Sequence, residues 1–395
     1  MTRYEVREAD TAFLKMPLAA VQALTSLGVC TASPAGDAGW RVSNVAKVGA
    51  ISFPGGEVHI QPKLEISRLF WMLGTGRQWG DWRDGDVELN RSDTLSAAIA
   101  ESFAHFAEAA LRRGILQGYR STEATETAVR GKWLISEQVR RRSGLVLPVE
   151  LQYDDYVADI AENRAIRGAA IRALRFPSLP PSLRRRLERI ERELFEVAPG
   201  THKSSQSVFF DRRNSHYRPA IELAGLILAE DGIDHGAQGA RSRSYLLDLA
   251  KMFEDFIEAE VRRAARNFPG TITAQHRGTL DQAQRVDIRP DLVWSKGGRV
   301  RAILDAKYKT EKPHRGHPNP DIYQMLAYCI RYGVRAGHLI YAKGNADPAR
   351  YVIEQAGVTI VCHALDLSAE PAQIERQVDW LVADALGPDL QQDLP

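Results

Sequence analysis

The alternation of apolar and polar residues near the start of the chain predicts strands. In segment 48–66, VGAISFPGGEVHIQPKLEI, the alternation occurs on both sides of a Pro-Gly-Gly turn and places Val58 and Ile60 on the face opposite His59. Two alternating runs joined by such a turn predict a β-hairpin. The segment 74–90 that follows is rich in Gly, Trp and Asp, and we expect it to form a loop.

A helical period replaces this alternation from Ser92 onward. Apolar residues recur three or four positions apart between Leu95 and Leu111. Further helices are expected at 163–174 and 182–197, separated by a proline-rich connector. The middle of the chain is therefore predicted to be helical.

The last third of the chain mixes both periods, as in an α/β domain. The predicted helices are 245–267 and 321–332, and the predicted strands are 336–342, 358–365 and two runs joined by Gly297-Gly298. The chain is thus expected to be a multidomain protein of the α+β and α/β classes. Its predicted parts are a β-rich N-terminal domain (1–91), a helical middle region (92–239) and a C-terminal α/β domain (240–395).

Composition narrows the class of protein without naming it. The chain has 395 residues, 44% of them apolar, which is enough to supply cores for two or three domains. Its three cysteines are far apart and show no CxxC spacing, so we expect neither a disulfide framework nor a zinc knuckle, and a reducing cytoplasm fits. We find no apolar run of about 18 residues, so no membrane span is expected. With a net charge of +2, any nucleic-acid binding must come from a local basic surface.

Candidate chemistry begins in the stretch ILDAKYK at 303–309. Residues two apart share one face of a strand, so Asp305 and Lys307 point the same way. An ordinary surface ion pair is the default interpretation of such a pair. The tripeptide alone therefore does not establish a site.

A second acid, Asp291, favours a functional site over an ordinary ion pair. It precedes Asp305 in the partner run of the predicted hairpin. A three-residue loop that pairs Lys296 with Val300 would place the two acids opposite each other, whereas a two-residue loop would put them on opposite faces. The acids can work together only if the hairpin has an odd-length loop or a bulge.

Two carboxylates that converge beside a lysine favour a bound cation, because they would otherwise repel each other. Mg²⁺ is the natural candidate, since carboxylates hold it together with water and phosphate oxygens, and Mn²⁺ can substitute. Such a cation would polarise a phosphate and activate a water molecule, while Lys307 would orient that water or stabilise the developing charge. This chemistry suits phosphodiester hydrolysis.

Asp291, Asp305 and Lys307 resemble the P-D…(D/E)-x-K signature of the restriction-endonuclease-like nucleases. The resemblance implies a mixed central sheet flanked by helices, and a further metal ligand from the backbone carbonyl of Ala306. In that fold a preceding helix often contributes an acid, here Glu254, which falls at helical spacing with apolar residues on the expected core side. The alternative is that Glu254 lies at the edge of the apolar face and pairs with a basic residue.

The helix after the D-x-K stretch carries a further resemblance. Gln324 and Tyr328 lie four apart on one helix face. A Q-x-x-x-Y helix in this position resembles that of the RecB-like nucleases, in which the glutamine sits near the metal. We therefore include Gln324 among the candidate catalytic residues.

As a whole, the chain resembles the McrC family, the nuclease subunits of McrBC modification-dependent restriction systems. The words that carry the resemblance, in addition to the hairpin at 48–66 and the D-x-K region, are VRGKW at 129–133, YDDYVADIAENR at 153–164 and FEDFIEAEV at 253–261. The resemblance implies a partner, an McrB-like AAA+ GTPase hexamer, and a substrate, double-stranded DNA that carries a modified base. It also implies that the partner binds the GTP, in agreement with the lack of GxxxxGK[ST] in this sequence.

In the McrC family the N-terminal part engages the motor. The resemblance therefore points to the region from Arg41 to Lys63, with Asn44 and Lys47 also able to reach a nucleotide site. Two other functions stay open: a stand-alone RecB-like repair nuclease, and a non-catalytic regulator of an AAA+ motor. The presence of both acids together with Lys307 and Gln324 speaks against the second.

Overall fold

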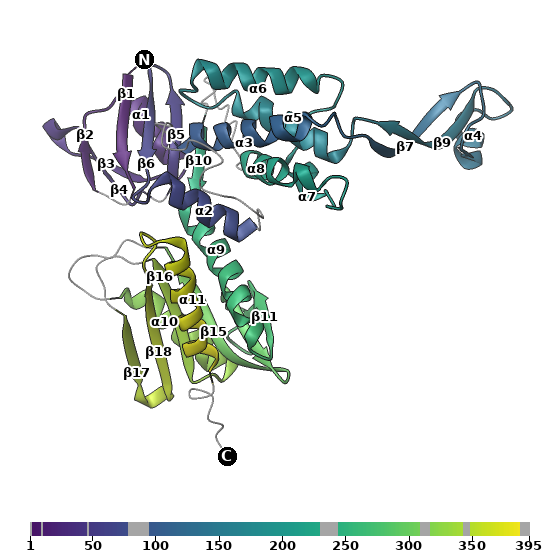
Figure 1. The fold of residues 1–395 in the computed structure, drawn as a ribbon. Coiled ribbons are helices and arrows are strands. Elements are labelled where there is room, and N and C mark those ends of the chain that lie inside the picture. Colours follow the sequence, from purple (N-terminus) through teal and green to yellow (C-terminus); the bar gives the residue numbers. More distant parts are fainter. Residues whose placement is uncertain are drawn as a thin grey trace. The chain divides into compact units, whose positions relative to one another are not determined.

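A computed structural model describes residues 2–8, 11–45, 47–77, 95–229, 244–308, 317–342 and 348–387. The chain divides into two compact units (Figure 1). The first joins Met1–Arg91 to Leu246–Pro395, and the second is Ser92–Tyr245. The N-terminal segment and the last third of the chain therefore share one unit, which the middle of the chain interrupts.

The predicted Pro-Gly-Gly hairpin is confirmed. Strands β5 (Lys47–Phe53) and β6 (Gly56–Gln61) pair antiparallel, with Ile51 opposite Val58. Strands β1 (Thr2–Arg7) and β10 (Ser244–Asp248) extend this pair to a sheet of order β1-β6-β5-β10. A smaller sheet of order β2-β4-β3 consists of Ala12–Leu14, Trp40–Ser43 and Thr31–Pro34, and helix α1 covers Leu18–Ser26.

Helix α2 (Ile66–Arg77) corrects the predicted boundary of the loop after the hairpin. The loop was expected to begin at residue 74, but the helix continues to Arg77. The rest of that expected loop, 78–90, lies outside the described residues. Gly and Thr near the end of a helix do not stop it when its apolar side chains pack, and Leu69, Phe70, Met72 and Leu73 are all buried.

Packed helices form much of the second unit. Its longer helices are α3 (Leu95–Leu111), α5 (Ala161–Ala173), α6 (Pro181–Glu193) and α8 (Arg218–Ala229), and a short helix, α7, covers His202–Gln206. The two helices predicted at 163–174 and 182–197 are confirmed, although the second ends at Glu193. The narrow apolar stripe of α6, Leu183, Leu187 and Ile190, is buried as its spacing predicts.

The wholly helical prediction for the middle region is wrong. Residues 118–157 contain a sheet of order β7-β9-β8, made of Gly118–Glu126, Val149–Val157 and Lys132–Trp133, with helix α4 (Ile135–Arg141) beside it. Exposed and half-buried positions alternate along β7, so the strand period is present. It was missed because β7, GYRSTEATE, carries the alternation with polar rather than apolar side chains.

A six-stranded mixed sheet forms the centre of the last third of the chain. Its order is β11-β14-β15-β16-β18-β17, and the strands are Thr271–Ala274, Leu292–Lys296, Arg299–Lys307, Ala336–Ala342, Val358–Leu365 and Ala349–Ile353. Strands β15, β16 and β18 run parallel, and the remaining pairs are antiparallel. A two-stranded sheet pairs β12 (Gly278–Thr279) with β13 (Asp287–Ile288).

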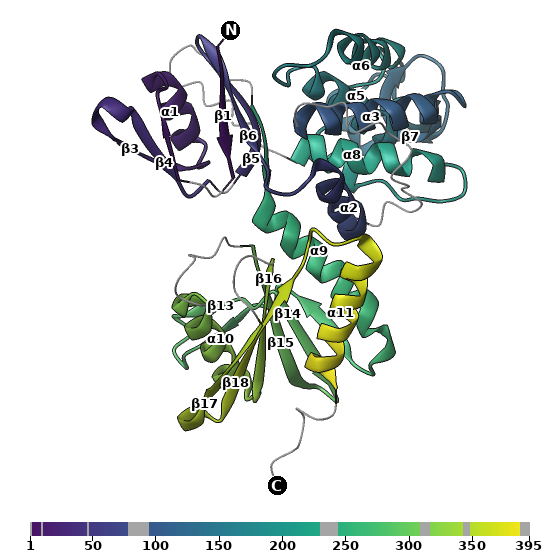
Figure 2. The same cartoon turned by 60° about the vertical axis from the view of Figure 1, so that its left-hand side comes forward.

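Helices cover both faces of the mixed sheet (Figure 2). Helix α10 (Asn319–Tyr332) packs on one face, where Met325 and Cys329 meet Leu339 of β16. Helices α9 (Leu249–Ala264) and α11 (Pro371–Leu386) lie on the other face. The predicted strands at 336–342 and 358–365 and the helix at 321–332 are confirmed, whereas β17 and α11 were not predicted.

The predicted helix at 245–267 begins later than expected. Residues 244–248 pair as β10 instead, and α9 starts after Asp248, whose side chain accepts a hydrogen bond from the Lys251 N–H (3.1 Å). A 3-10 turn, Ala265–Asn267, replaces the last helical turn. Among the helices described, none is long and apolar enough to cross a bilayer.

Candidate functional site

The hairpin of β14 and β15 closes with a two-residue loop and contains a bulge. Lys296 pairs with Arg299, so only two glycines form the loop, and both have positive φ (61° and 74°), as this tight turn requires. The register then shifts, because Trp294 pairs with Ala302 and leaves Arg301 as an extra residue on β15. Of the alternatives left open by the sequence, the structure therefore has an even loop with a bulge.

The bulge brings the two acids face to face. Leu292 pairs with Leu304, and one further step in this register sets Asp291 opposite Asp305. The Asp291 Oδ2 accepts a hydrogen bond from the Ala306 N–H (2.9 Å), and the Asp305 carboxylate accepts one from the Asp291 N–H. Side chain and backbone of the two strands thus hold both carboxylates at one place.

Asp305 is an acid in an unfavourable environment. Only 2% of its surface is exposed. Burial raises its pKa to about 6, the charge of Asp291 adds to this effect, and Lys307 partly opposes it. Its Oδ2 contacts the Lys307 ammonium directly. A buried acid beside a second acid is stabilised by positive charge, and a divalent cation supplies more of it than one lysine.

Lys307 links the acids to helix α10. Its Nζ donates a hydrogen bond to Gln324 Oε1 (2.9 Å), and Gln324 Nε2 donates to the Tyr328 hydroxyl (2.9 Å). The amide orientation follows from these partners, since an ammonium can only donate. The structure thus brings Asp291, Asp305, Lys307 and Gln324 together.

Glu254 lies at the edge of the apolar face of α9 and not in its core. Its side chain is 31% exposed, and its carboxylate lies 3.6 Å from Lys251 Nζ. Burial raises the pKa of Glu254, and the charge of Asp291 is the next cause. The expected core position is therefore corrected to an edge position with a lysine partner. Glu254 is still close enough for the charge of Asp291 to affect it.

Two polar side chains at the site were not predicted. Gln275 donates from its backbone N–H to the Asp291 carbonyl (2.7 Å) and from Nε2 to Asp291 Oδ1 (3.2 Å). Asp321 is buried and accepts a hydrogen bond from the Tyr341 hydroxyl (3.1 Å). No local pattern marks Gln275, and Asp321, in the first turn of α10, has the sequence position of an ordinary helix-terminal acid.

The donor set at Asp291 and Asp305 fits a hard divalent cation. It offers carboxylate oxygens, the ligands that Mg²⁺ and Mn²⁺ prefer. The Ala306 N–H donates a hydrogen bond to Asp291 Oδ2. Such an arrangement can hold a cation beside an ammonium, which suits the metal-assisted hydrolysis of a phosphodiester.

The N-terminal residues expected to contact another protein are far in the sequence from the candidate nuclease site. Two of them form hydrogen bonds within their own domain. Lys47 Nζ donates to the Leu27 carbonyl (3.0 Å), and Asn44 Nδ2 donates to the Thr31 hydroxyl (3.2 Å). Arg41, on β4, is exposed. Of the three, Arg41 is therefore the one whose side chain is most available for another protein.

Comparisons with known proteins point to one family. The family described as McrBC 5-methylcytosine restriction system component matches residues 42–342. A chain in the refined half-complex from a tetradecameric assembly of Thermococcus gammatolerans McrB AAA+ hexamers with bound McrC has a TM-score of 0.61 and 18% identity, over 97% of this chain and 100% of that one. This likeness shows a shared fold along nearly the whole chain.

A second solved structure, the cryo-EM structure of the Thermococcus gammatolerans McrBC complex, is also similar. It has a TM-score of 0.44 and 20% identity, over 67% of this chain and 88% of that one. No curated protein matches the sequence.

Proposed function

The chain belongs to the family of McrBC 5-methylcytosine restriction system components, and from this premise we propose that it is the McrC-like nuclease subunit of a modification-dependent restriction system. In this proposal its C-terminal domain is a PD-(D/E)xK endodeoxyribonuclease that depends on Mg²⁺. The observation that carries the proposal is the bulge at Arg301, because it sets Asp291 opposite Asp305 on the face that holds Lys307.

Each residue of the site has a proposed role. Asp291 and Asp305 would hold the cation, with the Ala306 carbonyl and Glu254 as further candidate ligands. The cation supplies polarisation of the scissile phosphate and activation of water. Lys307, fixed between Asp305 and Gln324, would orient the attacking water and stabilise charge on the phosphate. Gln324 is a positioning residue, since it acts by holding Lys307.

We further propose that an McrB-like AAA+ GTPase hexamer is the partner and that it binds the GTP. McrB AAA+ hexamers form part of the similar assembly described above. Double-stranded DNA with a modified base would be the substrate, and its recognition would belong to the partner. This chain would stimulate GTP hydrolysis and cut the DNA.

An exposed apolar surface in the second unit is a second candidate for the partner contact, besides the region from Arg41 to Lys63. We call the segment 129–147, between β7 and β9, the arm. Seven of its large apolar side chains are 43–73% exposed, namely those of Val129, Trp133, Ile135, Val139, Leu145, Val146 and Leu147. Apolar groups gathered on one segment are typical of a protein-binding surface.

The proposal is tested by Asp291→Asn and Asp305→Asn, assayed with the cognate GTPase. Cleavage of modified DNA should fall by about 10²-fold or more, because the cation loses a charged ligand. Stimulation of GTP hydrolysis should stay unchanged. Asp287→Asn, an exposed aspartate on β13, is the matched control and should cleave normally.

Three outcomes separate the candidate functions. Normal cleavage by both variants would exclude Asp291 and Asp305 as the nuclease site. Full cleavage by the wild-type chain without GTPase or GTP would favour a stand-alone repair nuclease. GTPase stimulation with no cleavage by the wild-type chain at any Mg²⁺ or Mn²⁺ concentration would favour a non-catalytic regulator.

A further inference from the structure

Two histidines and an aspartate converge on the side of the mixed sheet away from the candidate nuclease site. His338 lies on β16, His363 on β18 and Asp384 on α11, and one ligand atom of each lies within 4.8 Å of the others. The His338 Nδ1 and His363 Nε2 atoms are 3.0 Å apart. Three residue types that bind transition metals are thus brought together from three elements.

The strand register separates this cluster from the candidate nuclease site. His338 pairs with Leu304, whereas Asp305 pairs with Leu339, so His338 and Asp305 point to opposite faces of the sheet. Leu339 packs with Met325 of α10 on the nuclease side. The His338 side of the sheet is the one that carries α11, which contributes Asp384.

Some buried polar atoms of this cluster have no hydrogen-bond partner in the part of the chain that the structure describes. His338 is fully buried, and its Nε2 has no hydrogen-bond partner among the described residues. The buried Asp384 Oδ2 likewise has none, although Oδ1 accepts from Arg350 (2.7 Å). Unsatisfied buried polar atoms cost free energy. A cation held by His338 Nδ1, His363 Nε2 and Asp384 Oδ2 would satisfy the Asp384 oxygen, but not the His338 Nε2.

We propose that His338, His363 and Asp384 form a binding site for a transition-metal ion of the Zn²⁺ type, which ties α11 to the central sheet. Two imidazoles and a carboxylate are a ligand set that Zn²⁺ accepts, whereas Mg²⁺ and Ca²⁺ prefer oxygen ligands alone. Ligand atoms about 2.0–2.1 Å from a tetrahedral ion lie roughly 3.3 Å apart. His338 Nδ1 and His363 Nε2, 3.0 Å apart, already have nearly this spacing, and the Asp384 carboxylate lies within 4.8 Å of both histidine ligand atoms.

Arg350 is the charged group that opposes a cation here, and its position limits the effect. Its side chain is 49% exposed, so solvent screens its charge. It binds Oδ1 of Asp384 and leaves Oδ2 for the metal. A hydrogen bond of this kind to a ligating carboxylate also orients it, as outer-sphere partners do at many metal sites.

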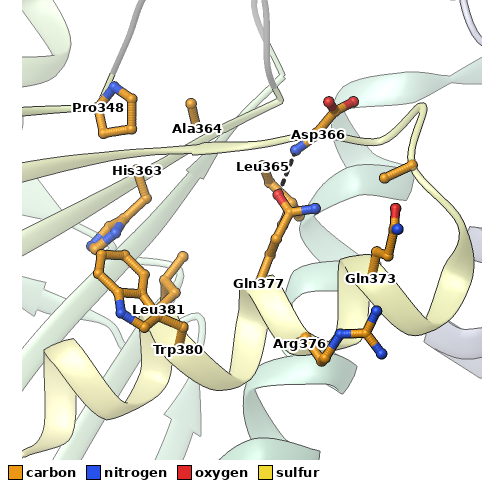
Figure 3. A pocket seen from close by; sticks show the side chains of 11 residues that line it. Pro348, His363, Ala364, Leu365, Asp366, Gln373, Arg376, Gln377, Trp380 and Leu381 are labelled. Carbon is orange, nitrogen blue, oxygen red and sulfur yellow. Dashed lines mark hydrogen bonds between the residues drawn. The ribbon is translucent and has the colours of Figure 1, made fainter.

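A cavity of about 560 Å³ between β18 and α11 gives the site an entry path. His363 and Trp380 form part of its wall, and Figure 3 shows the two rings side by side there. Three protein ligands leave a fourth coordination position for water or another small ligand. The cavity lets both the ion and that ligand reach His363.

The test uses Co²⁺ as a spectroscopic probe on the full chain carrying Asp291→Asn and Asp305→Asn. This background removes the carboxylates of the candidate nuclease site, so the readout does not depend on nuclease activity. We expect saturable binding of one Co²⁺ with visible absorption typical of a tetrahedral nitrogen and oxygen site, displaced by Zn²⁺. Zn²⁺ at about 100 times its Kd should raise Tm by about 5 °C or more.

Two further variants in this background locate the ion. His363→Ala and the near-isosteric Asp384→Asn should each weaken Co²⁺ binding by about tenfold or more and remove most of the Tm shift. Asp379→Asn is the matched control, since Asp379 is an exposed aspartate of the same helix. The proposal is overturned if Co²⁺ does not bind saturably, or if Asp384→Asn binds it as tightly as Asp379→Asn does. The second comparison holds even if His363→Ala does not fold.

Discussion

At the scale of single residues, Asp305 shows a conflict between stability and the proposed function. Burial raises its pKa from the ordinary 3.8 to about 6. A folded protein that binds this proton more tightly than the unfolded chain is most stable where both states are protonated. The contribution of Asp305 is therefore fully favourable below pH about 4 and is lost as the pH rises through about 6.

Asp305→Asn should accordingly stabilise the metal-free protein at pH 7.5. A shift of this size corresponds to up to about 3 kcal/mol, reduced by the loss of the contact with Lys307. Thermal unfolding in the presence of a chelator measures the gain, and at pH 4 the gain should vanish. A variant that is less stable than the wild type at pH 7.5 would contradict the proposed charge conflict.

The same pKa predicts how cleavage depends on pH and Mg²⁺. Protons and the cation compete for Asp305, so the Mg²⁺ concentration that gives half-maximal cleavage should rise about tenfold for each pH unit below about 6. Above pH 7 it should be constant. Mg²⁺ titrations of cleavage between pH 5 and 8, with the GTPase saturating, give this curve. A flat curve down to pH 5 would show that Asp305 does not bind the cation.

Lys307 and Gln324 should differ in the size of their effects. Lys307→Ala should lower the cleavage rate by about 10²-fold or more, and Lys307→Arg should restore only part of it, since the larger guanidinium cannot take the same position between Asp305 and Gln324. Gln324→Ala should cost about tenfold, because Lys307 keeps its contact with Asp305. Equal losses for Lys307→Ala and Gln324→Ala would assign Gln324 a direct role in place of positioning.

At the scale of elements, one extra residue decides the orientation of the two acids. With the two-glycine loop alone, Asp291 and Asp305 would point to opposite faces of the sheet, and the bulge at Arg301 corrects this. The bulge therefore acts as a part of the site although its own side chain is not proposed to touch the substrate.

Deleting Arg301 should leave both cleavage and GTPase stimulation largely intact. The deletion removes only the extra residue, so the hairpin becomes regular while Trp294 still pairs with Ala302 and Asp291 still lies opposite Asp305. Arg301→Ala keeps the bulge and serves as the control, so it should retain most of the cleavage. If the deletion abolishes cleavage while Arg301→Ala retains it, the pairing of Asp291 with Asp305 is not sufficient to align the acids.

At the scale of the whole molecule, the N-terminal segment and the last third of the chain form one compact unit. Trp71 of α2 contacts Phe256 of α9 with ring centroids 5.1 Å apart, and the Tyr308 hydroxyl donates a hydrogen bond to Glu8. Removing residues 1–90 would expose these surfaces and disturb the candidate nuclease domain. Partner contact is therefore better tested by smaller changes.

Two such changes distinguish the candidate surfaces. Replacing the arm, 129–147, by a short turn should reduce stimulation of GTP hydrolysis about tenfold or more if its exposed apolar side chains bind the motor. Arg41→Ala should have this effect instead if the N-terminal region is the contact. Circular dichroism and thermal unfolding show that each variant is folded. Normal stimulation by both variants would exclude both surfaces.

The sequence by itself determined the elements whose signals are local. The Pro-Gly-Gly hairpin, the strands at 336–342 and 358–365 and the common face of Asp305 and Lys307 all follow from a period of two residues and short turns. Local periodicity is sufficient there because each pattern lies within one or two adjacent elements.

Tertiary structure decided what depends on partners distant in the sequence. Residues 244–248 form a strand because β5 is available to pair with them, and Glu254 lies at an edge because of what packs beside α9. The sequence allowed two registers of the hairpin equally, and the bulge at Arg301 gives the one in which Asp291 lies opposite Asp305. His338, His363 and Asp384 have no metal-ligand spacing in the sequence and meet only because parallel strands and α11 converge, since contacts between elements follow from packing and not from period.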